Sequence, residues 1–123
     1  MPIIACECRA GLNAETKARI AREITDIVRS VILSPLDLIS VVFHDLPAES
    51  TYRSGEPTTD TLIICHIRDG RSDAAVLALA QGVSKVWSQC TGSSEENIEV
   101  AVQTYPAKYV VRGGERLPEA PRV

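Results

Sequence analysis

The stretch PIIACECRAG, residues 2–11, returns as TLIICHIRDG at residues 61–70, and this repetition decides the fold. Residues 2–48 align with residues 61–107 without a gap. Identical pairs are spread along the alignment: Ile4/Ile63, Cys6/Cys65, Arg9/Arg68, Gly11/Gly70, Ala21/Ala80, Ile39/Ile98, Val41/Val100, Pro47/Pro106 and Ala48/Ala107. Because the matches fall in turns as well as in apolar runs, we infer that the chain contains two copies of one unit.

Each unit is predicted to form a strand, a helix and a second strand. The expected strands cover residues 3–8, 38–44, 62–67 and 98–103. Apolar residues recur at helical spacing between the strands of each unit. Asn13 and Ser72 are suitable N-caps for the two helices, and Gly92 is suited to end the second helix in a left-handed conformation.

Two such units with right-handed crossovers predict a two-layer α+β fold, in which a four-stranded sheet carries both helices on one face. The strand runs IIAC, LIIC and ISVVF show little alternation of apolar and polar residues, which indicates burial on both faces. Two helices can cover only one face. Other copies of the chain are therefore expected to cover the second face.

The length of 123 residues suits a single domain. Residues 49–60 are interpreted as a linker between the units and residues 108–123 as a loose tail that includes one short strand. The net charge of −3 gives no electrostatic footprint for nucleic acid or an anionic membrane. No apolar run is long enough to span a membrane and the N-terminus lacks a basic signal region, so a cytoplasmic location is expected.

The cysteines are interpreted as reduced, buried thiols, because they form no C-x-x-C pair. They are Cys6, Cys8, Cys65 and Cys90. His44 and His66 do not complete a metal-ligand spacing with them, so neither a metal nor another cofactor is expected.

Pro2 is the first candidate for chemistry. Methionine is commonly removed before proline because the proline side chain is small, and removal would leave Pro2 as a secondary amine. A free α-amino group has a pKa near about 7.7–8.0, and nearby cations or burial lower it. Such an amine can act as a general base or acid near neutral pH. A Met-Pro start also occurs in many proteins that have no N-terminal chemistry.

Arg68 and Arg71 flank a tight turn at the predicted start of the second helix. Two guanidinium groups at a helix N-terminus can hold a carboxylate, although turn arginines are also often simply solvated. The repeat places Arg9 and Leu12 at the corresponding positions of the first unit. Pro2 in turn has only Thr61 as its counterpart. One half of the chain can therefore supply the amine and the other half the anion-binding groups.

These features resemble the tautomerase superfamily. The segment IRDGRSDAA at residues 67–75 is similar to the arginine turn of 4-oxalocrotonate tautomerase, which has one β-α-β unit per chain. Two fused units resemble the longer subgroups, which assemble as trimers. Residues 22–31, REITDIVRSV, and residues 97–118, NIEVAVQTYPAKYVVRGGERLP, resemble the cis-3-chloroacrylic acid dehalogenase subgroup in particular.

The resemblance implies a catalytic Pro2 and carboxylate binding by Arg68 and Arg71. It implies an isomerase that moves a proton between the enol and keto forms of a 2-hydroxy-2-enoate or 2-oxo acid, without a cofactor, in a homotrimer. The arginine that 4-oxalocrotonate tautomerase contributes from its second strand falls on Ser40 and Glu99. That departure favours substrates with one carboxylate, such as phenylenolpyruvate.

Other family positions are not retained. The helix histidine of the dehalogenases falls on Val28, and their water-activating tyrosine and glutamate fall on Ala101 and Arg112. Dehalogenation and a decarboxylation like that of malonate semialdehyde decarboxylase are therefore alternatives rather than the first expectation. A non-catalytic trimer is the third reading, and it applies if Met1 stays in place.

Three residues are weaker candidates for the pocket. Tyr52 and Tyr109 are expected at corresponding places after each unit, where the family often has an aromatic wall. Interface packing is an equally good interpretation of both tyrosines. Arg112 is either a third anion-binding group or a surface charge.

Overall fold

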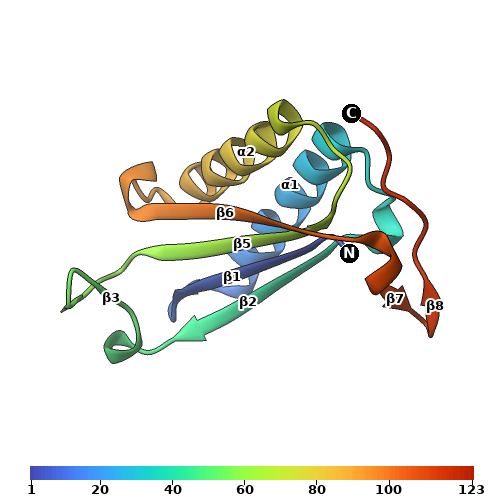
Figure 1. Ribbon diagram of the computed structural model, residues 1–123. Helices are drawn as coiled ribbons and strands as arrows, with labels where there is room; N and C mark the ends of the chain where they lie inside the picture. The colour runs from blue at the N-terminus through green and yellow to red at the C-terminus, as the bar shows by residue number, and fades with distance from the viewer.

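Two antiparallel helices lie on one face of a four-stranded sheet in the computed structural model, which describes residues 1–123 (Figure 1). The first unit contributes β1 (Ile3–Arg9), α1 (Ala14–Ile32) and β2 (Ser40–Leu46). The second contributes β5 (Thr61–Arg68), α2 (Asp73–Thr91) and β6 (Ile98–Tyr105). The predicted two-layer α+β fold of two β-α-β units is confirmed.

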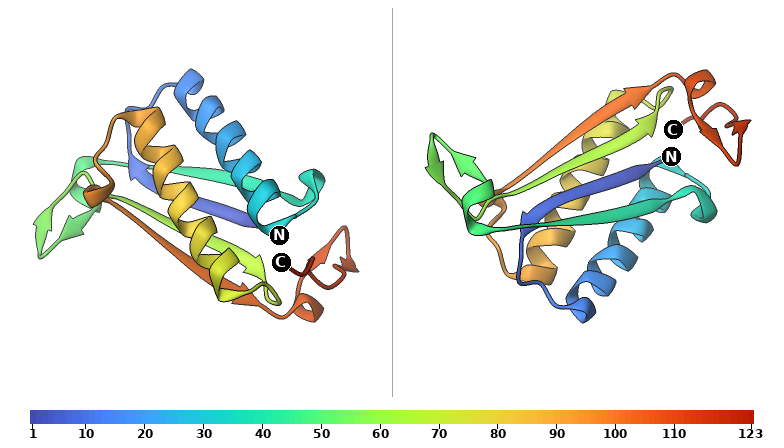
Figure 2. Two further views of the ribbon diagram at one scale, coloured as in Figure 1. Left: turned by 90° about the horizontal axis from the view of Figure 1, so that it is seen from above. Right: turned by 90° about the horizontal axis from the view of Figure 1, so that it is seen from below.

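The sheet has the strand order β2-β1-β5-β6. Within each unit the two strands are parallel, whereas β1 and β5 meet in the centre as an antiparallel pair with Ile3 opposite His66. Because of this pairing, the beginning of β1 lies beside the end of β5. Both chain ends are found at that end of the sheet (Figure 2).

The core lies between the sheet and the helices. Its fully buried members include Ile4, Cys6, Ile20, Ile24, Val28, Ile63, Cys65, Leu79, Val83 and Trp87. On the face away from the helices, Ile3, Val42 and Leu62 are exposed. The strands are thus apolar on both faces, as the sequence indicates, but a single chain buries only one of them.

The helix ends follow the expected capping with one exception. The Asn13 side chain accepts a hydrogen bond from the backbone of Thr16 at 2.8 Å, and Ser72 accepts one from Ala75 at 3.2 Å. Gly92 ends α2 with φ 77°, as predicted. The exception is α1, which ends at Leu33 with φ 55°, in the left-handed region that favours glycine.

Each unit is followed by a short hairpin. The first consists of β3 (Tyr52–Arg53) and β4 (Glu56–Pro57), and the second of β7 (Val111–Arg112) and β8 (Glu115–Arg116). Single 3-10 turns precede β2, β3, β6 and β7; they cover Leu36–Leu38, Ala48–Ser50, Glu95–Asn97 and Ala107–Tyr109. Arg53 and Arg112 take the same position in their hairpins, so the repeat continues beyond residue 107.

The tail is not loose. Ala120 is buried, and the backbone of Ser72 donates a hydrogen bond of 3.0 Å to the Val123 carbonyl. The final segment therefore packs against the start of α2. Neither α1 nor α2 has the length and apolar content that crossing a bilayer requires.

Candidate functional site

The site is built around the start of β1. Pro2 is fully buried there, and its carbonyl oxygen accepts a hydrogen bond of 3.0 Å from the Ser40 backbone. Because β1 and β5 are antiparallel, the residues that precede β1 run beside Arg68 at the end of β5. The fold thus places Pro2 and Arg68, which are far apart in the sequence, at one end of the sheet.

Arg68 is a buried cation with free hydrogen-bond donors. Only 1% of the Arg68 surface is exposed, and its Nη1 donates a hydrogen bond of 2.8 Å to the Pro118 carbonyl. Its Nε and Nη2 are buried and have no partner. These two groups form one edge of the guanidinium, the edge that can hold a carboxylate through two parallel hydrogen bonds. A buried unpaired donor is costly, so this edge favours an anionic ligand.

The charges around Arg68 favour a neutral amine. The amino group of Met1 lies near Arg68 and Arg112, and burial together with these two charges lowers its pKa below the usual value of an α-amino group. Arg112 is exposed, and its side chain forms no hydrogen bond or ion pair. Burial also lowers the pKa of Arg68, an effect that the Glu119 carboxylate opposes.

Arg71 has a different environment. It is 9% exposed, and its guanidinium donates to the Arg68 carbonyl at 2.8 Å and the Ser34 hydroxyl at 2.9 Å. Two further bonds, of 3.2 and 3.4 Å, reach the Ile32 carbonyl. A guanidinium has five N–H groups, so only one remains free. Burial and the neighbouring Arg68 lower the pKa of Arg71 to about 10, which keeps it protonated at neutral pH.

Three partners in this site were not expected from the sequence. Ile32 and Pro118 act through backbone carbonyls, for which side-chain patterns carry no signal. Ser34 has an identical counterpart, Ser93, at the same place in the second unit, but its role depends on Arg71, which the first unit lacks at the equivalent position.

The two tyrosines lie at opposite ends of the sheet, and neither is buried in the single chain. Tyr52 lies in β3, at the opposite end of the sheet from the N-terminus, and is 56% exposed (Figure 1). Tyr109 lies in the turn before β7 and is 75% exposed. The expectation that they occupy corresponding places is wrong, because the aligned counterpart of Tyr52 is Val111.

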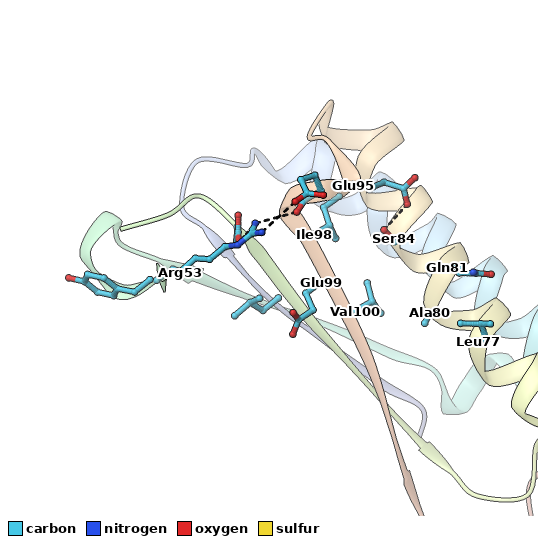
Figure 3. Close-up of a pocket in the computed structure, with 14 residues that line it drawn as sticks. Arg53, Leu77, Ala80, Gln81, Ser84, Glu95, Ile98, Glu99 and Val100 are labelled. Carbon is cyan, nitrogen blue, oxygen red and sulfur yellow. Dashed lines mark hydrogen bonds and ion pairs between the residues drawn. The ribbon is translucent and has the colours of Figure 1, made fainter. Parts of the chain in front are cut away.

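A cavity of about 670 Å³ lies along β6, α2 and the β3–β4 hairpin (Figure 3). Its lining includes Asp60, Glu95, Glu96 and Glu99. Its one cation, Arg53, is 3.3 Å from the Asp60 carboxylate and 3.4 Å from that of Glu96. An acidic cavity whose arginine is neutralised does not suit a carboxylate, so the positive end of the sheet at Arg68 is the candidate site.

Comparison with known proteins agrees with this architecture. The family model described as "Tautomerase enzyme" matches residues 2–61. A protein of Lactococcus lactis subsp. lactis named as a probable tautomerase is 39% identical over 56 residues, which cover 46% of this chain and 92% of the relative. The chain belongs to the tautomerase family. It is therefore placed among enzymes rather than binding modules.

Solved structures of two tautomerase-fold proteins resemble the whole chain. N1, described as a member of the cis-3-chloroacrylic acid dehalogenase family, superposes with a TM-score of 0.93 at 26% identity, covering 97% of this chain and 85% of N1. A fused 4-OT described as an asymmetric trimer has a TM-score of 0.89 at 22% identity, covering 94% and 95% of the two chains. The second likeness shows the fold alone.

Proposed function

We propose that this tautomerase moves a proton between the enol and keto forms of a small carboxylate-bearing substrate, with Pro2 as general base and acid after removal of Met1. The observation that supports this most directly is the unpaired Nε/Nη2 edge of the buried Arg68 beside the start of β1. It offers a carboxylate two hydrogen bonds close to the proposed amine.

In the proposed reaction, Arg68 binds the 1-carboxylate of a 2-hydroxy-2-enoate. The Pro2 nitrogen takes the proton of the 2-hydroxyl group, and the electrons of that O–H bond form the carbonyl. The π electrons of the C2–C3 double bond form a new C3–H bond with the proton that the protonated Pro2 returns, so that the C2–C3 bond becomes single. Pro2 returns the proton that it took, so the enzyme is unchanged at the end of the reaction. Catalysis comes from proximity and proton transfer. Arg71 retains one N–H that can add to carboxylate binding.

The charges of the site serve this mechanism. The base must be neutral before it accepts a proton. Burial, Arg68 and Arg112 lower the pKa of the Met1 amino group, and the same surroundings are expected to keep a free Pro2 amine largely neutral at neutral pH. A substrate with one carboxylate fits best, because Ser40 and Glu99 stand where a further arginine would be needed.

Hydration chemistry has less support. The position that carries a histidine in the dehalogenases is Val28, which is fully buried in the core. The positions of the water-activating pair are Ala101 and Arg112, neither of which can act as a general base at neutral pH. A non-catalytic role would follow if Met1 were retained, because the Pro2 nitrogen would then be an amide without basicity.

The same proposal includes a homotrimer. Ile3, Val42 and Leu62 leave the open sheet face apolar and exposed, and burying it against other copies would be favourable. A similar fused protein is described as a trimer. Light scattering during size-exclusion chromatography should give three times the 13.3 kDa chain mass; a monomeric mass would contradict this part.

The function is tested by ketonisation of phenylenolpyruvate and 2-hydroxymuconate, followed by absorbance. Protein of verified mass with a free Pro2 should be active, and a form that keeps Met1 should lose about 10²–10⁴-fold in kcat, the usual contribution of a general base. Thr61→Ala, at the equivalent place of the second unit, is the matched control and should leave the rate unchanged. Equal activity with and without Met1 would contradict the role of Pro2.

A further inference from the structure

Arg71 joins two segments that belong to different units. Its guanidinium reaches the end of α1 through the Ile32 carbonyl and the Ser34 hydroxyl, and it reaches the end of β5 through the Arg68 carbonyl. All three partners are buried. A planar group held at 2.8–3.2 Å by three acceptors has little freedom to turn toward a ligand.

We propose that Arg71 is a positioning residue, which keeps the Arg68 guanidinium in place by tying the Arg68 backbone to the left-handed turn after α1. The inference builds on the proposed function, in which Arg68 binds the substrate carboxylate. It assigns carboxylate binding mainly to Arg68, whose Nε/Nη2 edge is free, and support of that edge to Arg71, whose donors are used within the protein.

The repeat shows why the turn after α1 needs this support. In the second unit, Gly92 takes the left-handed conformation and its own N–H donates to the Ser88 carbonyl at 2.8 Å. In the first unit a leucine, Leu33, takes the same conformation. The two units also differ at the position of Arg71. In the structure Arg71 donates hydrogen bonds to the residues around the leucine turn, whereas the aligned residue of the first unit, Leu12, has no side-chain donor.

The position of Arg71 also suits the end of α1. The last carbonyls of a helix lack intrahelical partners and carry partial negative charge. The Arg71 guanidinium supplies donors and a positive charge to the Ile32 carbonyl in a buried place. The turn is thus held on one side and the Arg68 backbone on the other.

Arg68 is then fixed at both ends. Its carbonyl accepts from Arg71, and its Nη1 donates to the Pro118 carbonyl in the final segment. Only the Nε/Nη2 edge is left without a partner. A misplacement of about 1 Å can lower a rate by about 10²-fold, so loss of Arg71 is expected to lower the rate mainly through the position of Arg68.

A double-mutant cycle in KM and kcat tests this role with the processed protein and phenylenolpyruvate. Arg71→Leu, which installs the counterpart residue, should lower kcat/KM by about 10²-fold. In an Arg68→Ala background the same change should cost less than about twofold, because Arg71 acts through Arg68. Losses that multiply independently would show that Arg71 binds the substrate itself and would overturn the proposal.

Ser34→Ala tests the same chain of contacts with a smaller change. It removes one acceptor of Arg71 and should lower kcat/KM severalfold. Ser93→Ala, at the equivalent place of the second unit, removes a hydroxyl that donates no hydrogen bond and should have no effect. Equal rates for Ser34→Ala and the wild type would contradict the proposal.

A measurement without substrate separates this inference from the proposed function. The Arg68 Nε–H signal, assigned by its loss in Arg68→Lys, should show an ordered side chain by ¹⁵N relaxation in the wild type and in Ser93→Ala. It should become mobile in Arg71→Leu and in Ser34→Ala while the backbone spectrum is kept. An Arg68 side chain that stays ordered in both variants would overturn the positioning role. Inactivity of the processed wild type toward both enols would instead contradict the proposed function.

Discussion

The start of β1 and the start of β5 are equivalent places in the repeat, and their chemistry differs. The aligned pairs are Pro2/Thr61, Arg68/Arg9, Arg71/Leu12 and Arg112/Arg53. Both places lie before a central strand and beside the end of the other one. The scaffold is therefore the same, and a difference in activity is expected to come from these residues and from the chain end at Pro2.

The start of β1 and the start of β5 also differ in whether nearby carboxylates neutralise their arginines. Arg53 forms ion pairs with Asp60 and Glu96. Arg112 forms none, and Arg68 keeps two buried donors without a partner. Asp60, directly before β5, is the aligned counterpart of Met1. A carboxylate thus neutralises one place from within the chain, whereas the other remains positive, and the comparison teaches that an anionic ligand is expected only at the start of β1.

The largest difference is expected between Pro2 and Thr61. Pro2→Ala should lower kcat/KM for a carboxylate enol by about 10²–10³-fold, because it replaces the proposed base with a less constrained primary amine. Thr61→Ala should change it by less than about twofold. Steady-state rates of mass-verified proteins measure both. A Pro2→Ala rate within a few-fold of the wild type would remove the asymmetry on which the proposed mechanism depends.

The two strand-end arginines should differ next. Arg68→Ala is expected to raise KM by about 10- to 100-fold, since hydrogen bonds to charged groups contribute about 1.5–3 kcal/mol. The carboxylate is bound in both the ground and transition states, so kcat should fall less than KM rises. Arg9→Ala is the control and should leave KM unchanged, because Arg9 lies near Thr61 rather than Pro2. Similar KM values for the two variants would contradict carboxylate binding at Arg68.

Arg112 and Arg53 provide a test through pH. The kcat/KM of a reaction that needs a neutral amine rises as pH passes through the pKa of that amine. Arg112 contributes, after burial and Arg68, to lowering the pKa of the Met1 amino group, and its charge is expected to act in the same way on a free Pro2 amine. Arg112→Ala should therefore raise the pKa of that amine and move the rising limb of the profile to higher pH. The shift should be below about one unit, because solvent screens the exposed guanidinium. Arg53→Ala is the control and should leave the rising limb of the pH profile in place. A shift of that limb to lower pH in Arg112→Ala would contradict the effect of Arg112 on the amine.

Local signals in the sequence predicted most of the scaffold. The caps at Asn13, Ser72 and Gly92 and the four-stranded sheet with both helices on one face follow from residue type, spacing and the handedness of crossovers. The strand order and the antiparallel pairing of the two central strands come from the structure. The hairpins β3–β4 and β7–β8 are harder to predict from the sequence, because strands of two residues show no periodicity. Their alignment through Arg53 and Arg112 becomes evident only once the repeat is extended past residue 107.

The residues of the candidate site can be chosen from the sequence, but their hydrogen-bond partners cannot. The sequence indicates Pro2 and Arg68 together, and the fold places them at one end of the sheet. The free edge of Arg68 and the occupied donors of Arg71 depend on carbonyls of Ile32 and Pro118, which tertiary structure supplies. The left-handed Leu33 had no signal either, because a leucine takes that conformation only where the surroundings support it.

The smallest expected difference lies in the turns that end the helices. Gly92→Ala should lower the free energy of unfolding by about 1 kcal/mol, because a Cβ there meets no atom within 4 Å and only the left-handed conformation opposes it. Leu33→Gly should raise that free energy by less than about 1 kcal/mol, because Leu33 is 50% exposed and the greater freedom of glycine in the unfolded chain offsets part of the gain. Thermal unfolding at equal protein concentration measures both. If Arg71 supports the leucine turn, Leu33→Gly should stabilise Arg71→Leu more than it stabilises the wild type. Equal gains in the two backgrounds would show that the turn and Arg71 are energetically independent.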